Sequence, residues 1–182
     1  FIVFFFFVGS GYVILPEAKD YKRIGDGDTG PNTGGMGAVS PVVFADSAFM
    51  QKIEDRVVKP TITGLQKEGI EYKGFIFVGI MNVGGNPFVI EYNARMGDPE
   101  TQAVLLRIKS DFVELLVAAA KGELDSMKID IDEHFAVTIA LVSGGYPGEY
   151  VTGKVIQGLE HTGEAMVFHA GTNRNEETVQ TH

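Results

Sequence analysis

The sequence predicts an α+β protein built from two units. Residues 1–131 combine apolar runs, joined by glycine-rich turns, with segments of helical periodicity, and therefore predict an antiparallel sheet packed against helices. Residues 132–182 contain only short strand-like runs and predict a small, incomplete antiparallel β domain. The turn-like segment 125–133 separates the two patterns and is the best candidate for a domain boundary.

Composition places the chain among ordinary globular proteins, because 45% of its 182 residues are hydrophobic and 21% are charged. The formal net charge of −9 argues against nucleic acid and anionic membranes as partners. A local basic segment can still bind phosphate, so nucleotides remain compatible with this charge. The absence of cysteine excludes a disulfide scaffold and a thiolate metal site, and it fits a cytoplasmic protein.

The first apolar run covers residues 1–8 and ends at Gly9-Ser10-Gly11. It is too short to cross a bilayer, so we expect a buried strand rather than a targeting segment. The glycine-rich turn should pair this strand with residues 12–15 in a hairpin. A sequence that opens inside a strand also leads us to expect further chain upstream.

Residues 17–40 are polar and rich in glycine, and we expect a long loop there, which is either functional or disordered. Residues 49–69 follow with helical periodicity, and Pro60 should kink or divide that helix. The apolar positions that define the period are Ile53, Val57, Val58, Ile62 and Leu65.

Residues 74–83 and 87–92 predict two paired strands, because Gly84-Gly85-Asn86 between them is typical of a hairpin turn. Two helices should follow, at residues 99–106 and 111–122. Ser110 is a suitable N-cap for the second helix, and Gly122 stands where it should stop.

The last third of the chain predicts short strands at residues 135–142, 150–156 and 165–170. Residues 173–182 are polar, and we expect them to fray.

The candidate metal site is Glu91-Tyr92-Asn93, at the end of the second strand of the 74–92 pair. Strand alternation places Glu91 and Asn93 on one face and Tyr92 on the other. A carboxylate and an amide oxygen can ligate a hard cation such as Mg²⁺ or Mn²⁺, with a nucleotide supplying further oxygens. A solvated strand end would account for the same residues.

Directly downstream stand Arg95, Gly97, Asp98, Pro99 and Glu100, where a strand ends and a helix begins. Arginine and helix amino termini both favour bound anions. Plain helix capping, with Asp98 as N-cap and Pro99 in the first turn, explains part of this pattern. It does not explain Arg95.

A second candidate site is the glycine-rich segment 28–37, which follows the basic residues Lys19, Lys22 and Arg23. Glycines let backbone amides approach a phosphate or carboxylate closely. The segment has neither the Walker A nor the Rossmann spacing. It is therefore either an anion-binding loop or simply a flexible one.

Together these segments closely resemble the signature of phosphoribosylamine–glycine ligases, in the same order and spacing. The resemblance covers nearly the whole chain, and its two most specific runs are the glycine-rich segment and the one that starts at Glu91. The matching segments are Asp20-Tyr21-Lys22-Arg23, Pro31-Asn32-Thr33-Gly34-Gly35-Met36-Gly37, Glu91-Tyr92-Asn93-Ala94-Arg95-Met96-Gly97-Asp98-Pro99-Glu100-Thr101-Gln102, Lys109-Ser110-Asp111, Ala118-Ala119-Ala120-Lys121-Gly122, Gly145-Tyr146-Pro147-Gly148 and Phe168-His169-Ala170-Gly171-Thr172.

The resemblance implies an ATP-grasp fold for residues 1–131 and a reaction of purine biosynthesis. In this reaction glycine is joined to 5-phosphoribosylamine through a glycyl phosphate, giving glycinamide ribonucleotide, ADP and phosphate. Glu91 and Asn93 would hold Mg²⁺ or Mn²⁺ on the ATP phosphates, and Arg95 and Asp98 would be catalytic. The residues implied in binding substrate or phosphate are Lys22, Arg23, Asn32, Thr33, Gly34, Gly35, Met36 and Gly37.

Two departures from the family pattern follow from the residues. Segment 74–88, where many ATP-grasp enzymes carry another metal carboxylate, has no Asp or Glu, so a further ligand would come from elsewhere. The amino-terminal domain and the nucleotide lid of the family are expected upstream, so this fragment is expected to be inactive alone. The alternatives are another ATP-grasp carboxylate–amine ligase, or a non-catalytic module derived from one.

Overall fold

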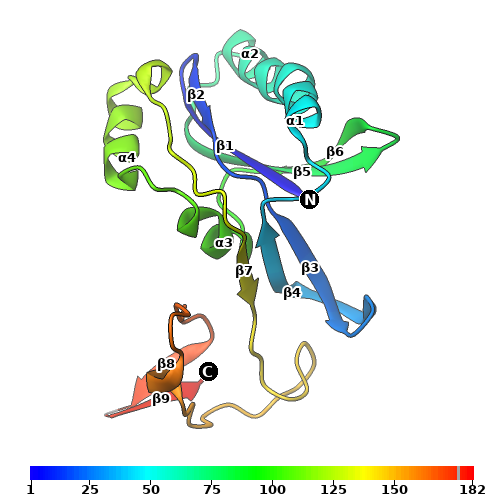
Figure 1. Ribbon diagram of the computed structural model, residues 1–182, viewed down its shortest axis with the longest axis vertical. Helices are drawn as coiled ribbons and strands as arrows, with labels where there is room; N and C mark the ends of the chain where they lie inside the picture. The colour runs from blue at the N-terminus through cyan, green and yellow to red at the C-terminus, as the bar shows by residue number, and fades with distance from the viewer. Residues whose placement is uncertain (176) are drawn as a thin grey trace.

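The computed structural model describes residues 1–175 and 177–182 (Figure 1). Helices and antiparallel sheets alternate along the chain, which confirms the predicted α+β class. No helix within the described residues has the length and apolar character needed to cross a membrane.

The central sheet has four antiparallel strands in the order β2-β1-β5-β6. Strands β1 (Ile2–Val8) and β2 (Gly11–Ile14) form the predicted first hairpin. Strands β5 (Lys73–Val83) and β6 (Asn86–Asn93) form the predicted second one. Strand β1 pairs with β5 over its whole length, so the two hairpins make one sheet.

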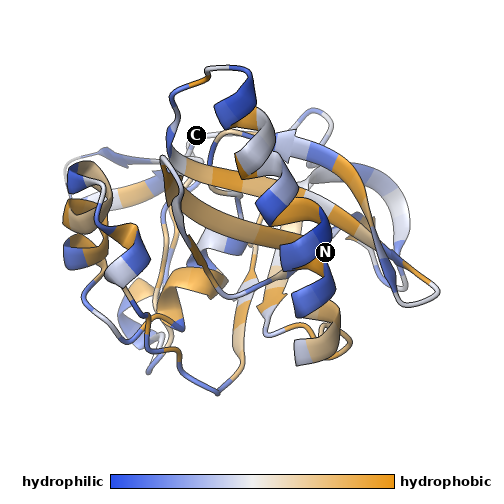
Figure 2. Cartoon of the chain, turned by 90° about the horizontal axis from the view of Figure 1, so that it is seen from above, coloured by the Kyte–Doolittle hydropathy of each residue, from blue (hydrophilic) through white to orange (hydrophobic). Residues whose placement is uncertain are grey.

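Both faces of β1 are covered, which explains why every residue of this strand is apolar. On one face Phe4 packs with the third and fourth helices, and on the other Phe5 packs with the first two. Figure 2 shows the apolar strands of the sheet lying between helices. The first core includes Ile2, Phe4, Phe6, Phe77, Val104 and Leu115. The second includes Val3, Phe5, Phe7, Ile53, Val58 and Val78.

The helix predicted at residues 49–69 is confirmed, and it contains an irregular turn. Helix α1 (Ser47–Ile53) passes into the π-helical turn η1 (Glu54–Val58) and then into α2 (Lys59–Lys67). Lys59 donates its backbone N–H five residues back, to the Glu54 carbonyl. The wide turn immediately precedes Pro60, which has no N–H to donate, so the proline is accommodated without a break.

The two predicted later helices are confirmed as α3 (Glu100–Leu106) and α4 (Phe112–Lys121), with one correction. The N-cap of α4 is Asp111, whose carboxylate accepts from the backbone of Val113 at 2.8 Å. Ser110 instead accepts the backbone N–H of Asp130. Gly122 ends α4 in the left-handed conformation, as predicted.

The predicted loop at residues 17–40 is wrong, because this segment forms two long strands. Strands β3 (Lys19–Gly25) and β4 (Thr29–Ser40) make a hairpin, and β7 (Ala136–Ile139) pairs with the other edge of β4. Glycine and polar residues disfavour strands locally, but pairing with β7, about a hundred residues away, satisfies the β4 backbone. The strand predicted at 135–142 is confirmed in its β7 part.

The predicted strands at residues 150–156 and 165–170 are wrong. The only pairing there within the described residues is a bridge from Val155 to Gln180. Instead β8 (Thr172–Asn175) and β9 (Thr178–Thr181) form a hairpin, which corrects the fraying expected for 173–182. Short alternating runs form strands only where a partner strand is available. Two 3₁₀ turns, η2 (Leu124–Ser126) and η3 (Leu159–His161), complete the described elements.

The buried side chain of Arg107 connects the end of β4 to the segment that precedes β7. Arg107, only 7% exposed, donates through Nε to the carbonyls of Asp132 (3.0 Å) and His134 (3.1 Å). Its Nη1 donates to the Ser40 hydroxyl at 2.9 Å. The end of β4, the end of α3 and the segment before β7 therefore meet on one guanidinium group.

Replacing Phe4 by alanine is expected to lower the free energy of unfolding by about 3–5 kcal/mol. Phe4 is fully buried, and its ring lies edge-on to Phe77 with centroids 5.4 Å apart. Denaturant unfolding followed by circular dichroism measures the change. Phe168→Ala, at a position that is 47% exposed, is the control and should cost less than about 1 kcal/mol. Equal losses in the two variants would contradict this description of the core.

Candidate functional site

Strand β6 presents Glu91 and Asn93 on one face of the central sheet. Their partners on β5 are Gly79 and Phe77, and Phe77 belongs to the core on the α3–α4 side. Tyr92 faces the other way, and its hydroxyl lies 2.9 Å from that of Thr61 on α2. The predicted alternation at this strand end is therefore confirmed as geometry.

Gly79 makes room for the Glu91 side chain. A Cβ atom at position 79 would lie 3.1 Å from the Glu91 Cγ, closer than ordinary van der Waals contact. Glycine at this point in the strand therefore allows the carboxylate to lie across β5. The pairing is irregular immediately beyond it, where a bulge between Gly79 and Ile80 shifts the register.

A small pocket brings Glu91 together with the basic strand β3. The pocket holds about 140 Å³, and the Lys22 ammonium in its wall lies 3.5 Å from the Asp20 carboxylate. A cation and two carboxylates from different sheets therefore surround one space. The residues lining it are Phe1, Ile2, Asp20, Lys22, Phe77, Gly79, Ile90 and Glu91.

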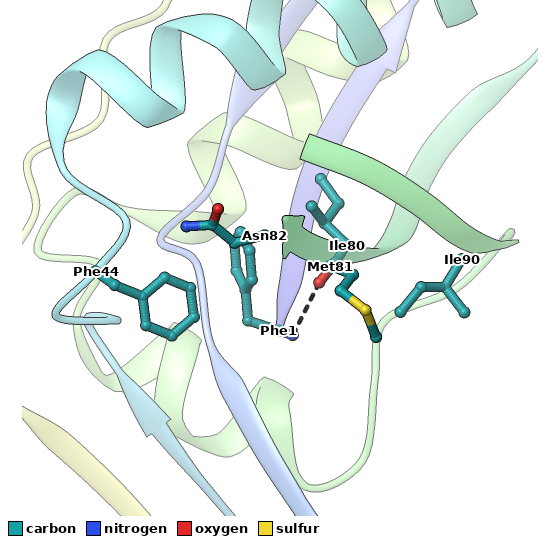
Figure 3. Close-up of a pocket in the computed structure, with 6 residues that line it drawn as sticks. All are labelled: Phe1, Phe44, Ile80, Met81, Asn82 and Ile90. Carbon is teal, nitrogen blue, oxygen red and sulfur yellow. Dashed lines mark hydrogen bonds between the residues drawn. The ribbon is translucent and has the colours of Figure 1, made fainter. Parts of the chain in front are cut away.

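A larger and mostly apolar hollow of about 390 Å³ adjoins this pocket, because both are lined by Phe1 and Ile90. Figure 3 shows its lining side chains around the amino end of β1, where the Phe1 amino group donates to the Ile80 carbonyl at 3.1 Å. Its lining residues are Phe1, Phe44, Ile80, Met81, Asn82 and Ile90. The two hollows together run from an apolar end to a charged end.

The predicted residues Arg95 and Asp98 lie just beyond the end of β6. The Arg95 guanidinium stands 5.8 Å from the centre of the Phe77 ring, on the sheet face that carries Glu91, and donates to the Met96 carbonyl. Asp98 is exposed and accepts from the Gln102 amide at 2.8 Å. The capping expected of Asp98 is wrong: α3 begins at Glu100, its N-cap position is Pro99, and no side chain caps it.

Glu100 is a buried carboxylate close to this site. It is 3% exposed, and its Oε2 has no hydrogen-bond partner within the described residues. Burial raises the pKa of Glu100 above its usual value; its own backbone amide and Lys22 oppose the shift, and the negative charges of Asp20 and Asp98 add to it. Folding therefore makes the carboxyl of Glu100 harder to ionise than it is in the unfolded chain.

The glycine-rich segment touches the run that follows β6, although the two are far apart in sequence. A Cβ at Gly35 would lie 2.3 Å from the Pro99 Cδ, so only glycine permits this approach. The Thr33 hydroxyl donates to the Lys22 carbonyl (2.9 Å) and accepts from the Gly35 amide (3.0 Å). Two of the sequence motifs therefore meet in space.

The other members of the glycine-rich segment contact the chain around β7. The Gly34 amide lies 3.4 Å from the Tyr146 hydroxyl, and the Met36 carbonyl accepts from Ala140 at 2.9 Å. Gly37 is buried, and a Cβ there would lie 2.7 Å from the Thr138 carbonyl. These glycines belong to a strand and allow close backbone packing, which corrects the loop prediction.

Of the predicted site residues, only Lys22 and Glu91 line the pocket; Asn93 does not, and Arg23 and Asn32 lie apart from it. Arg23 donates to the Gly30 carbonyl at 2.7 Å near the tip of the β3–β4 hairpin, and Asn32 is its exposed cross-strand partner. Neither lines the two hollows described above. The structure therefore brings Lys22 to Glu91 and leaves Arg23 outside.

Several site residues escaped the sequence predictions. Asp20 lies two positions before Lys22 on a strand, but its region was expected to be a loop, so alternation was not applied. In the sequence, Glu100 is notable only because it follows Asp98 and Pro99 at a predicted helix start. Ile90 and Phe77 look like ordinary strand residues. Tyr146 lies in the matching run Gly145-Tyr146-Pro147-Gly148, but that run carries no local sign of a role.

The donor set suits a metal that takes part of its coordination from a substrate. Within the described residues, no cluster of three or more His, Cys, Asp or Glu side chains could hold an ion. Glu91 and Asn93 provide two oxygen donors on an accessible face, which is the number magnesium takes when phosphates supply the rest.

Glu100→Gln should change how stability depends on pH. Burial holds the pKa of Glu100 above its usual value, so the folded protein keeps a proton that the unfolded chain releases. Stability therefore falls as pH rises through this window. The melting temperature of the variant relative to the parent should therefore increase between pH 4.5 and pH 7. Thermal melts of both proteins, with the exposed Glu114→Gln as control, measure this difference. A constant difference across that range would contradict burial of the charge.

Comparisons with known proteins identify the family of the chain. Residues 1–101 match the family model "Phosphoribosylglycinamide synthetase, ATP-grasp (A) domain", and residues 136–182 match "Phosphoribosylglycinamide synthetase, C domain". A phosphoribosylamine–glycine ligase of Escherichia coli O6:H1 is 49% identical over 168 residues, which is 90% of this chain and 39% of that protein. One from Caldanaerobacter subterraneus is 42% identical over 98% of this chain and 43% of its own length.

Solved structures give the same result. The phosphoribosylamine–glycine ligase of Thermotoga maritima superposes with a TM-score of 0.88 at 37% identity, covering 99% of this chain and 44% of that one. An L-amino acid ligase of Bacillus licheniformis shares only the fold, with a TM-score of 0.54 at 15% identity, over all of this chain and 48% of its own. The chain thus spans about two fifths of the length of the curated relatives. Because the A-domain model alone matches 101 of its 182 residues, the chain belongs to the phosphoribosylglycinamide synthetase family of ATP-grasp proteins.

Proposed function

We propose that the full-length protein joins glycine to 5-phosphoribosylamine at the expense of ATP, forming glycinamide ribonucleotide, ADP and phosphate. The observation that carries this proposal is the pair Glu91 and Asn93 on one face of β6, with Lys22 lining the pocket that Glu91 also lines. Oxygen donors for a metal and a cation for phosphate are what an ATP-dependent ligase needs at the point of phosphoryl transfer.

The nucleotide is proposed to lie along the two adjoining hollows. Its base and sugar would occupy the apolar end near Ile80, Met81 and Ile90, and its phosphates would reach the charged end near Lys22 and Glu91. The change from apolar to charged lining over a short path matches the two halves of ATP.

A divalent cation, Mg²⁺ or Mn²⁺, would be held by Glu91 and Asn93. When bound, it would neutralise charge on the transferring phosphoryl group. The Lys22 ammonium adds a second positive charge in the same pocket, partly balanced by Asp20 at 3.5 Å. Gly79 keeps the Glu91 carboxylate free to reach the ion.

The reaction would proceed in two steps. The glycine carboxylate attacks the γ-phosphorus of ATP, the bond to ADP breaks, and glycyl phosphate forms. The amine of phosphoribosylamine then attacks the carbonyl carbon, phosphate leaves, and the amine loses a proton as the amide forms. The protein contributes mainly by positioning the reactants and by stabilising negative charge.

The acceptor side of the site is proposed to be the meeting point of the glycine-rich strand and the run after β6. Arg95, held over the Phe77 ring, would bind a substrate carboxylate or phosphate. Asp98, whose second carboxylate oxygen has no partner within the described residues, would orient the amine. The exposed backbone of Asn32 and Gly34 would approach the ribosyl phosphate.

We propose that residues 1–131 form part of the ATP-grasp catalytic domain and that 132–182 begin a small β-rich domain. Because the chain spans only about two fifths of its curated relatives, the remaining parts of a full-length protein would supply the nucleotide lid and an amino-terminal domain. Since ATP and both other substrates belong to intracellular metabolism, the enzyme is proposed to act in the cytoplasm.

The proposal is tested by measuring ADP release from full-length protein with each substrate omitted in turn. ADP should appear only when glycine and phosphoribosylamine are both present, and Glu91→Gln should lower kcat/KM by about 100-fold or more. The exposed Glu71→Gln is the matched control and should be active. ADP formation that does not depend on glycine would reject the proposal. Coupling to a different amine would indicate another carboxylate–amine ligase.

Gly79→Ala tests the space beside the metal pair. The added Cβ would press on the Glu91 Cγ, so the affinity for Mn²⁺ in the presence of ATP should fall by about tenfold, with the protein still folded. Electron paramagnetic resonance of Mn²⁺ measures free ion directly. Gly64→Ala on helix α2, where a Cβ meets nothing within 4 Å, is the control and should bind the ion normally. Unchanged Mn²⁺ affinity in Gly79→Ala would contradict the proposal that Gly79 makes the space from which Glu91 binds the ion.

A further inference from the structure

Tyr146 belongs to a part of the chain to which neither the motifs nor the mechanism above gives a role. It lies in the run Gly145-Tyr146-Pro147-Gly148, beyond β7, more than a hundred residues from the glycine-rich strand. Its hydroxyl nevertheless lies 3.4 Å from the Gly34 amide. A residue of the second predicted domain thus reaches the substrate side of the first.

A continuous set of contacts links Tyr146 to the small pocket that Lys22 and Glu91 line. Gly34 adjoins Thr33, and the Thr33 hydroxyl donates to the Lys22 carbonyl at 2.9 Å. The Lys22 side chain lines the pocket that also contains Glu91. The strand that holds Gly34 is itself fixed on β7 by pairing from Gly37 to Ser40. Tyr146 therefore stands next to the site without being part of the nucleotide pocket.

The hydrogen-bond capacity of this hydroxyl is only partly used. A phenol has one proton to donate and can also accept, and here its oxygen accepts from the Gly34 amide. No acceptor for its own proton lies within hydrogen-bond distance in the described part of the chain. Gly34 is exposed, so a ligand can approach the pair. At 3.4 Å the existing bond is long, so the amide is available to an incoming anion as well.

We propose that Tyr146 binds substrate, donating its hydroxyl proton to an anionic oxygen held against the backbone of Gly34. This rests on the proposed function and identifies the anion as the phosphate of phosphoribosylamine. The glycine carboxylate has to meet the nucleotide next to Glu91, whereas Tyr146 lines neither hollow and is connected to Lys22 only through Gly34 and Thr33. The ribosyl phosphate, at the far end of the acceptor, fits this more distant position.

Tyr146→Phe in full-length protein removes the hydroxyl and keeps the ring. The KM for phosphoribosylamine is expected to rise about tenfold, while kcat and the KM for glycine and ATP change less than about twofold. Tyr150→Phe is the matched control, because its ring lies beside that of Tyr146 with centroids 6.1 Å apart. This control should leave all the constants unchanged.

Calorimetric titration with ribose 5-phosphate provides a readout that does not need turnover. Tyr146→Phe should weaken this binding about tenfold and Tyr150→Phe should not. That result would support phosphate binding by Tyr146 even if ADP formation proved independent of glycine. The calorimetry therefore tests the role of Tyr146, and the ADP assay tests the ligase function, independently of each other. A rise in the KM for glycine alone would overturn the assignment to phosphate. Unchanged binding and kinetics, or equal losses for every substrate together with a lower melting temperature, would overturn the role of Tyr146 in binding.

Discussion

The structure depends on strand β1 being buried on both faces. Its seven residues are all apolar because helices α1 and α2 pack on one side and α3 and α4 on the other. A strand covered on both faces cannot slip by one residue without moving large side chains between two differently shaped cores. The register from β1 to β5, and from β5 to β6, is fixed in this way. The orientation of Glu91 follows from that register.

In the candidate site, side chains approach the backbone of two glycines unusually closely. Gly79 admits the Glu91 side chain, and Gly35 admits the ring of Pro99. Glycine weakens a strand by roughly 0.5–1 kcal/mol relative to alanine, so these positions favour the site over local stability. The same region also buries the carboxylate of Glu100, one oxygen of which has no hydrogen-bond partner among the described residues. The sheet and its two cores supply the stability that this arrangement lacks.

The sequence was sufficient for the elements whose pattern is local. The apolar run of β1, the Gly84-Gly85 turn and the helix around Pro60 were each predicted, as was the alternation that puts Glu91 and Asn93 on one face. The β3–β4 hairpin was missed because its strand pairing depends on β7, far along the chain, and not on local propensity. For the same reason local pattern could not bring Asp20 to the pocket or Tyr146 to Gly34: each of these contacts crosses sheets or predicted domains. The family resemblance covers Lys22 and Arg23 alike, whereas the structure places Lys22 in the pocket lining and Arg23 outside it.

The contacts of the Arg107 guanidinium have a practical consequence for expressing residues 1–131 alone. Two of its three acceptors, the carbonyls of Asp132 and His134, come after the boundary drawn at residue 131, as does the strand that covers one edge of β4. Ending the chain at residue 131 would leave the buried Arg107 guanidinium without two of its acceptors and would expose the edge of β4 that pairs with β7. Both changes promote aggregation. A shortened chain that extends through β7 keeps the Arg107 hydrogen bonds and the β4–β7 pairing. The shortest fragment suitable for experiments therefore ends after β7, and not at the change in sequence pattern near residue 131.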